Sequence, residues 1–216
     1  MQPIVFKNKQ EILDRFVLPT DTVLDVGFWG QGTTIDDPGW IHGYLLKKAA
    51  VVYGVDLIFD ATRLQHPEQY QLAGAENFSF PVQFDVIYAG DLIEHVQNPG
   101  LFLDNCKKHL KSGGKLIINT PNCYSLENLA GKLMQKEPVV NDDHVCYYNE
   151  KTFRQLCKKN KNWQVEQVHY LYALPIHYRQ SIKKRLLNIF YALLAKCTNK
   201  YLDCFVFVLK ENKENA

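Results

Sequence analysis

The sequence predicts an α/β protein, with a doubly wound, mostly parallel sheet and helices on both faces. Three observations support this fold class. Strand-like and helix-like segments alternate along most of the chain, glycines directly follow the first apolar strand, and an acidic residue ends the second strand. Alternation of this kind is typical of parallel sheets whose crossover helices cover both faces.

Hydrophobic periodicity and turn residues predict the individual elements. We expect helices over 4–16, 40–49, 100–110, 124–134, 149–158 and 178–197, and strands over 22–26, 51–55, 84–88, 115–120, 163–170 and 201–209. Helix 100–110 should stop at Ser112-Gly113-Gly114, where glycine can adopt the left-handed conformation of a helix cap. Pro121 should end the strand that follows, because proline cannot donate to a strand ladder.

Length and composition indicate one domain with a packed core. The 216 residues suit a single domain over 1–210 with a helical insertion at about 171–200, followed by a disordered polar tail over 211–216. A content of 46% hydrophobic and 22% charged residues is that of a globular protein. The formal net charge of +2 gives no reason to expect a nucleic-acid partner.

Cysteine usage and the shortness of the apolar runs favour a cytoplasmic protein. The six cysteines form no C-x-x-C pair, and we expect free thiols. The first 17 residues mix charged and apolar positions, unlike a signal peptide. The longest apolar-rich stretch, 186–195, is shorter than the roughly 20 residues that span a bilayer.

A glycine-rich turn follows the first strand, in the segment Asp25-Val26-Gly27-Phe28-Trp29-Gly30-Gln31-Gly32. Glycines let the backbone turn tightly and let a ligand approach where a Cβ would block it. The second strand runs into Asp56, and an acid at that position can accept both hydroxyls of a ribose. Together, the turn and the acid indicate a site for an adenosine-containing cofactor.

Two other interpretations fit these features when they are taken alone. The glycines can form an ordinary loop while Asp56 caps a helix. A nicotinamide-dependent enzyme would also use the same strand, turn and acid. The sequence downstream distinguishes between these interpretations.

Three segments resemble motifs of class I S-adenosylmethionine (SAM) dependent methyltransferases. Asp25, which one residue separates from Gly27, matches the acid of the first motif. Segments 84–96 (FDVIYAGDLIEHV) and 109–122 (HLKSGGKLIINTPN) are similar to the fourth-strand and fifth-strand motifs of ubiquinone-biosynthesis-type O-methyltransferases. Related enzymes among glycan-modifying proteins have similar motifs. The resemblance covers roughly 23–156. It implies a Rossmann-like, seven-stranded sheet and SAM as the cofactor.

The resemblance also implies roles for the matching residues. The glycines of the turn would wrap the methionine part of SAM, Asp56 would hold the ribose, and Leu57 would pack on the adenine. Backbone groups near Gly90 would meet the SAM amino group. The cofactor-binding residues implied in this way are Asp25, Gly27, Gly30, Gly32, Asp56, Leu57, Ala75, Glu76 and Gly90.

The sequence departs from the family pattern in two places that bear on this site. The glycine turn has one additional residue, and the aromatic side chains of Phe28 and Trp29 could lean over the cofactor or fill a surface gap. Gly74 stands where the family often has an aspartate for the adenine edge. Adenine recognition should then fall to Glu76 or to main chain.

A second group of residues is expected to lie beside the methyl group of SAM. Asp91, Glu94 and His95 are spaced to share one face of a helical turn after strand 84–88, and His144 lies in a loop that should return to the same edge. These two carboxylates and two imidazoles could bind a divalent metal such as Mg²⁺, which would polarise an acceptor hydroxyl. The pattern resembles that of magnesium-dependent terminal 2'-O-methyltransferases of small RNAs.

Two alternatives need no metal. His95 or His144 could act as a general base, because a neutral imidazole can accept the proton of a hydroxyl. In a purely structural interpretation, Glu94 and His95 orient a helix and His144 hydrogen-bonds its own loop.

The predicted helix 178–197 combines an apolar stripe with four basic residues near its start, Arg179, Lys183, Lys184 and Arg185. Such a helix can pack on the sheet or on a second subunit in a homodimer. It can also make a peripheral contact with an anionic membrane or cover an acceptor.

The expected function is therefore SAM-dependent O-methylation of a hydroxyl on a small molecule, a sugar or a glycan. A non-catalytic SAM-binding scaffold is the main alternative, because the glycine turn is altered and the adenine aspartate is missing. An RNA 2'-O-methyltransferase is a third possibility, and the near-neutral charge disfavours it.

Overall fold

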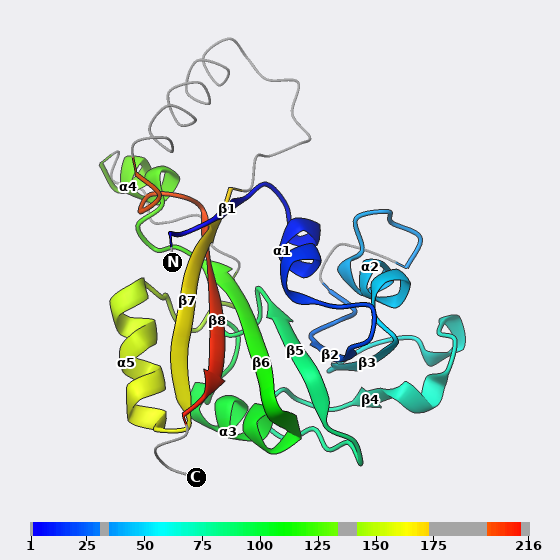
Figure 1. The fold of residues 1–216 in the computed structure, drawn as a ribbon. Helices are drawn as coiled ribbons and strands as arrows, with labels where there is room; N and C mark the ends of the chain where they lie inside the picture. The colour runs from blue at the N-terminus through cyan, green and yellow to red at the C-terminus, as the bar shows by residue number, and fades with distance from the viewer. Residues whose placement is uncertain (1, 31–34, 134–141, 173–197, 213–216) are drawn as a thin grey trace.

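The computed structural model describes residues 2–30, 35–133, 142–172 and 198–212, and these form one mixed sheet flanked by helices (Figure 1). The sheet has eight strands in the order β1-β7-β8-β6-β5-β2-β3-β4. In chain order these are β1 (Val5–Phe6), β2 (Thr22–Val26), β3 (Val51–Asp56), β4 (Tyr70–Leu72), β5 (Phe84–Gly90), β6 (Leu110–Pro121), β7 (Trp163–Leu171) and β8 (Cys204–Glu211). The pairs are parallel, except that β8 runs antiparallel to β6 and β7.

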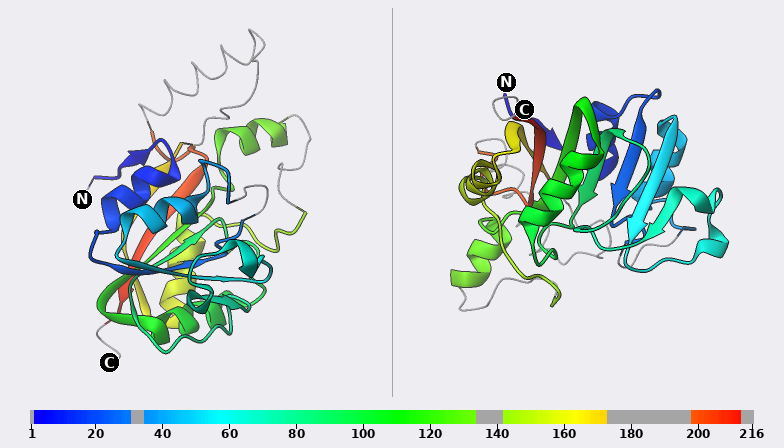
Figure 2. Two further views of the ribbon diagram at one scale, coloured as in Figure 1. Left: turned by 90° about the vertical axis from the view of Figure 1, so that its right-hand side faces the viewer. Right: turned by 90° about the horizontal axis from the view of Figure 1, so that it is seen from below.

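The helices cover both faces of this sheet, as Figures 1 and 2 show. Alternate residues of each strand point to opposite faces. Val23 of β2 therefore packs with α1 and α2, whereas its neighbour Leu24 packs with α3 and α5. The described helices are α1 (Lys9–Phe16), α2 (Ile41–Lys48), α3 (Pro99–His109), α4 (Leu126–Leu133) and α5 (Glu150–Asn160), with short 3₁₀ turns at Ala61–Arg63 and Pro67–Gln69.

The predicted fold class is confirmed, and the differences lie at the edges of the sheet and at the ends of elements. The sheet has eight strands rather than the seven that the resemblance implies, and its two short edge strands, β1 and β4, are not among the six strands that periodicity predicts. The predicted helix 4–16 begins only at Lys9, where the Asn8 side chain accepts a hydrogen bond from the Glu11 amide as an N-cap, and Val5–Phe6 before it pairs with β7. The glycines at 113 and 114 do not cap α3. The helix ends at His109, and its C-cap, Leu110, is already extended as the first residue of β6.

Some predictions fall on residues outside the described part of the chain. These are Gly32 of the glycine turn, the helix 178–197 and residues 213–216 of the tail. In the described part, β8 continues through Glu211. No helix among the described residues is long and apolar enough to cross a membrane.

The N-terminal segment is held to β7 by a buried imidazole. His169 is 1% exposed and stacks on Phe16, and its Nδ1 accepts the backbone N–H of Ile4 at 3.0 Å. Its Nε2 faces Gln167 Oε1 at 2.9 Å. Burial, together with the charges of Arg15 and the N-terminus, lowers the pKa of His169. The hydrogen bond from the Ile4 amide therefore requires that His169 Nδ1 carry no proton.

Acid should weaken this attachment. Below the unfolded pKa of 6.5 the unfolded chain takes up a proton at His169 that the folded chain resists, so this residue's contribution to stability falls as pH falls from 6.5. Replacing it by glutamine should make the free energy of unfolding, measured with urea between pH 7 and about pH 5, less pH-dependent than in the wild type. His66→Gln, at an exposed site, is the matched control. If the free energy of unfolding changed equally with pH in the wild type and in His169→Gln, His169 would not be a source of the pH dependence.

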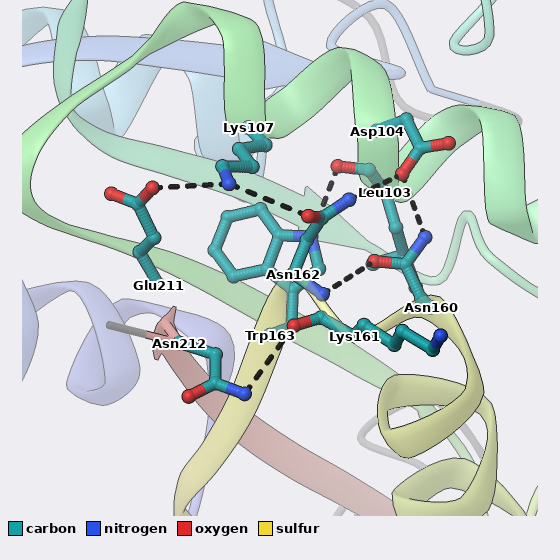
Figure 3. Close-up of polar contacts among 9 residues, drawn as sticks. All are labelled: Leu103, Asp104, Lys107, Asn160, Lys161, Asn162, Trp163, Glu211 and Asn212. Atoms are coloured by element: carbon teal, nitrogen blue, oxygen red, sulfur yellow. Dashed lines mark hydrogen bonds and ion pairs between the residues drawn. The ribbon is translucent and has the colours of Figure 1, made fainter. Parts of the chain in front are cut away.

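The turn between α5 and β7 is fixed by a polar cluster at the opposite end of the sheet (Figure 3). The side chains of Asn160 and Asn162 both donate to Asp104 Oδ1 at 2.8 Å, and Trp163 Nε1 donates to the Leu103 carbonyl at 3.0 Å. Lys161, in the middle of the turn, has a φ of 65°. This left-handed conformation strains a residue that has a Cβ.

Glycine at position 161 should relieve this strain. We expect the Lys161→Gly variant to be more stable than the Lys161→Ala variant by about 1 kcal/mol in the free energy of unfolding. Both variants lose the lysine side chain, but only alanine keeps the Cβ that strains the left-handed conformation. Urea denaturation of the two variants measures the difference. If the Lys161→Ala variant were as stable as the Lys161→Gly variant, or more stable, the turn would not be strained.

Candidate cofactor and acceptor site

The site lies where the central parallel strands end. β2 pairs with β3 on one side and with β5 on the other, and β5 pairs with β6. The carboxyl ends of all four strands therefore meet at one edge of the sheet, which is where open α/β sheets bind ligands. The glycine turn leaves β2 here, Asp56 ends β3, and Asp91 follows β5.

The glycine turn has the backbone conformation that its sequence predicts. Gly27 and Gly30 have φ angles of 80° and 72°, which residues with a Cβ rarely adopt. The Gly27 amide donates to the Val55 carbonyl at 2.8 Å, which ties the turn to β3. A Cβ on Gly27 would lie 3.1 Å from Leu92 Cδ1, so the turn also touches the segment after β5.

Asp56 binds the backbone around it. Its Oδ2 accepts the Trp29 amide at 2.9 Å, and its Oδ1 accepts the Ile58 amide at 3.3 Å. A carboxylate has about four acceptor positions, so it can still accept ligand hydroxyls. Leu57 beside it is 76% exposed, which leaves an apolar side chain available next to the acid.

Asp25 is buried beneath the turn, at 3% exposure, and its partner was not predicted from the sequence. His42 Nδ1 lies 3.0 Å from Asp25 Oδ2, and His42 Nε2 lies 3.0 Å from the Tyr70 hydroxyl. Burial and the nearby Asp25 raise the pKa of Tyr70 to about 12. The Phe28 ring packs on His42 and Tyr70, with centroids 4.7 and 5.0 Å away, so it fills space beneath the turn. Phe28 is 3% exposed, so it fills interior space rather than the surface gap considered for it.

The remaining predicted cofactor residues make structural contacts of their own. Glu76 Oε1 accepts the Asn98 amide at 2.5 Å, which fixes the start of α3, and Ala75 packs against the core. Gly90 ends β5, and a Cβ there would lie 2.5 Å from the Tyr88 hydroxyl. Only glycine therefore fits at position 90.

Three of the four residues expected near the acceptor come together. Ligand atoms of Glu94, His95 and His144 all lie within 4.8 Å of one another, and the two imidazole rings are 4.5 Å apart. The backbone holds the two segments together, because the Val145 amide donates to the Glu94 carbonyl at 2.9 Å.

Glu94 is a buried carboxyl group with one unused oxygen. It is 2% exposed, and its Oε2 accepts the Thr120 hydroxyl at 2.8 Å. Within the described residues, Oε1 has no hydrogen-bond partner. Burial, reinforced by the charge of Asp91, raises the pKa of Glu94 to about 7. The pKa of His144 is lowered, by burial and then by His95.

The fourth residue, Asp91, is not part of this group. The prediction that Asp91, Glu94 and His95 share a helical face is wrong, because the segment is an irregular turn and Asp91 has a φ of 50°. This left-handed residue points its carboxylate to another set of partners. Its Oδ2 lies 2.5 Å from Lys9 Nζ, and its Oδ1 accepts a hydrogen bond from the Asn119 side chain.

The chain is similar to methyltransferases in both sequence and fold. A family model described as a methyltransferase domain matches residues 6–168. The ubiquinone biosynthesis O-methyltransferase of Coxiella burnetii (strain RSA 493 / Nine Mile phase I) is 34% identical over 114 residues, which is 46% of this chain and 43% of that protein. The chain thus matches less than half the length of this curated relative.

Two solved structures extend the likeness to almost the whole chain. A chain in the complex between the Haloferax volcanii Trm112 methyltransferase activator and a putative methyltransferase superposes with a TM-score of 0.64, at 15% identity, over 93% of this chain and 87% of that one. For a SAM-dependent methyltransferase from Archaeoglobus fulgidus the TM-score is 0.61, at 16% identity, over 94% and 93%. These identities establish the fold alone. The family-model match over most of the sequence, together with the glycine turn and the sheet, shows that this chain belongs to the class I SAM-dependent methyltransferases.

Proposed function

We propose that this chain binds SAM at the carboxyl edge of its sheet and methylates a hydroxyl group of a small molecule, a sugar or a glycan. The observation that carries the proposal is the position of two features at one edge. The glycine turn with Asp56 lies at the ends of β2 and β3. Glu94 and His95 follow β5, and His144 reaches them from the loop before α5. One feature suits a nucleoside cofactor, and the other suits a hydroxyl acceptor.

The cofactor half fits SAM through its backbone. Gly27 and Gly30 leave main chain uncovered in conformations that other residues rarely adopt, and Asp56 offers carboxylate oxygens for ribose hydroxyls. SAM, when bound, supplies an already activated methyl group. The protein then has to align the acceptor oxygen with that group, and alignment supplies much of the rate.

The acceptor half can orient a hydroxyl and receive its proton. Glu94 Oε1 is buried without a partner among the described residues, so it can accept a hydrogen bond from an acceptor O–H. The lowered pKa of His144 keeps its imidazole neutral at physiological pH, which is the form that takes up a proton. A hydroxyl acceptor also agrees with the name of the partly matching relative, an O-methyltransferase.

Substitutions on the cofactor side and on the acceptor side of the site should affect different measurements, SAM affinity and turnover respectively. Asp56→Ala should weaken SAM binding, measured by calorimetry, by about tenfold or more, because hydrogen bonds to a charged group are lost. His95→Ala and His144→Ala should leave SAM affinity within about twofold and lower turnover by roughly 10²-fold or more, the usual contribution of a general base. His66→Ala, at an exposed site, is the control for both measurements.

Each outcome distinguishes the proposal from its alternatives. Failure of the intact protein to bind SAM would contradict the cofactor assignment. SAM binding without methylation of any compound in a panel of hydroxyl, glycan and quinone acceptors would favour a scaffold protein. A large loss of SAM affinity in the histidine variants would make those residues supports of the cofactor pocket.

A divalent cation on the acceptor side is a second candidate, and the orphaned Glu94 oxygen favours it. The donor set is one carboxylate and two imidazoles, which suits Zn²⁺ or Mn²⁺ better than Mg²⁺. Glu94, His95 and His144 would hold the ion. The ion would supply Lewis-acid polarisation of the acceptor hydroxyl.

Metal titration tests this candidate without any acceptor. Calorimetric binding of Mn²⁺ or Zn²⁺ to the chelator-treated protein should fall by roughly 10-fold to 100-fold in Glu94→Gln and His144→Ala. Asp91→Asn is the matched control and should retain the affinity, since that carboxylate pairs with Lys9. No binding by the wild type, or equal loss in all three variants, would contradict the three-residue site.

A further inference from the structure

Cationic residues are concentrated on α5 and on the turn that joins it to β7. Segment 149–163 contains five of them and one acid, Glu150, whereas the whole chain has a formal net charge of +2. The rest of the chain is therefore slightly acidic, and the positive charge of this segment is local. The cationic residues are Lys151, Arg154, Lys158, Lys159 and Lys161.

Four of these residues surround two hollows beside α5, the helix that packs on β7 (Figure 1). Arg154, Lys158 and Lys161 line a first hollow of about 410 Å³ between the helix and the strand. Arg154 and Lys158 also line a second hollow along α5, where Lys151 joins them. We call Lys151, Arg154, Lys158 and Lys161 the basic groove.

The single acid of this segment does not neutralise the groove. Glu150 pairs with Arg154, with 2.9 Å between Oε1 and Nε. Within the described part of the chain, neither Lys151 nor Lys158 has an ion-pair partner. Both lysines are exposed, so they can bind carboxylates of another molecule.

The surroundings of the groove favour a polypeptide ligand over a bilayer or a nucleic acid. Phe153 and Cys157 are 0% and 2% exposed, so the apolar residues that a membrane-binding helix would insert face the core instead. Trp163, the aromatic residue of the first hollow, is 3% exposed. Its Nε1 donates to the Leu103 carbonyl (Figure 3), so its ring cannot stack on a base.

The first hollow also contains groups that suit a peptide main chain. The side-chain amides of Gln164 and Asn212 line it. An amide side chain has both donors and an acceptor, so it can bind peptide carbonyl and N–H groups. Cationic side chains that surround such a hollow are a common means of recognising acidic segments.

We propose that the basic groove binds an acidic segment of a partner protein, whose carboxylates pair with the four cationic side chains. This function is separate from methyl transfer, because the turn that contains Lys161 lies at the end of the sheet opposite the SAM site. Complementary charge selects a partner and speeds its association more than it adds affinity. Salt screens exposed charges, so binding should weaken as ionic strength rises.

The test uses a fluorescent octaglutamate peptide, whose anisotropy measures binding at low and at high ionic strength. Lys158→Glu should lower the affinity roughly tenfold, because it replaces an attraction by a repulsion at a residue that lines both hollows. Lys158→Gln, which only removes the charge, should lower it less. Lys47→Glu is the matched control and should bind as the wild type does. It changes the net charge equally and also lies in the last turn of its helix, α2.

Several outcomes would overturn the inference. No binding of the peptide by the wild type would contradict it directly, and equal losses in Lys158→Glu and Lys47→Glu would mean that only net charge matters. Vesicles containing phosphatidylglycerol, or an oligothymidylate, that bind more tightly than the peptide and lose that binding in Lys158→Glu would assign the groove to a membrane or to a nucleic acid. Dimers of the wild type that dissociate in Lys158→Glu, measured by analytical ultracentrifugation, would assign it to a second copy of the chain. If Lys158→Glu unfolds, Lys158→Gln alone decides the test.

Discussion

The parallel pairing of β2 with both β3 and β5 is the constraint on which the site depends. Val23 of β2 is in register with Val52 on one side and Val86 on the other. Because the three strands run in the same direction, their carboxyl ends meet, and the chain must leave the sheet three times within one small region. The glycine turn, Asp56 and Asp91 are the residues at those three exits.

The polar groups at this edge fall into two kinds. Asp25 and Asp91 are fully engaged, one through His42 and Tyr70, the other through Lys9 and Asn119. Such satisfied networks hold the backbone around them in one arrangement. Glu94 differs, since one of its buried oxygens lacks a partner among the described residues and its pKa is raised. An unsatisfied carboxyl group beside two imidazoles is costly for stability, and such groups are concentrated at functional sites.

Aromatic packing explains how the chain accommodates the additional residue of its glycine turn. Phe28 is buried against Gly54 of β3, where a Cβ would lie 2.7 Å from its ring. Trp40 Nε1 donates to the Phe28 carbonyl at 2.9 Å. Trp40, directly before α2, thus supports the turn through Phe28, and Gly27 and Gly30 keep their left-handed conformations.

The sequence by itself determined the fold class, the central strands and the glycine turn with its acid. These follow from local pattern, since apolar runs, glycines and strand-end acids need only their neighbours in the chain. Tertiary structure alone decided the partners. Helical spacing grouped Asp91 with Glu94 and His95, but the left-handed Asp91 turned toward Lys9, and His144 reached Glu94 through a backbone contact between residues far apart in sequence. No sequence motif includes His42 or Lys9. Their contacts with Asp25 and Asp91 join residues that come close only when the sheet has formed.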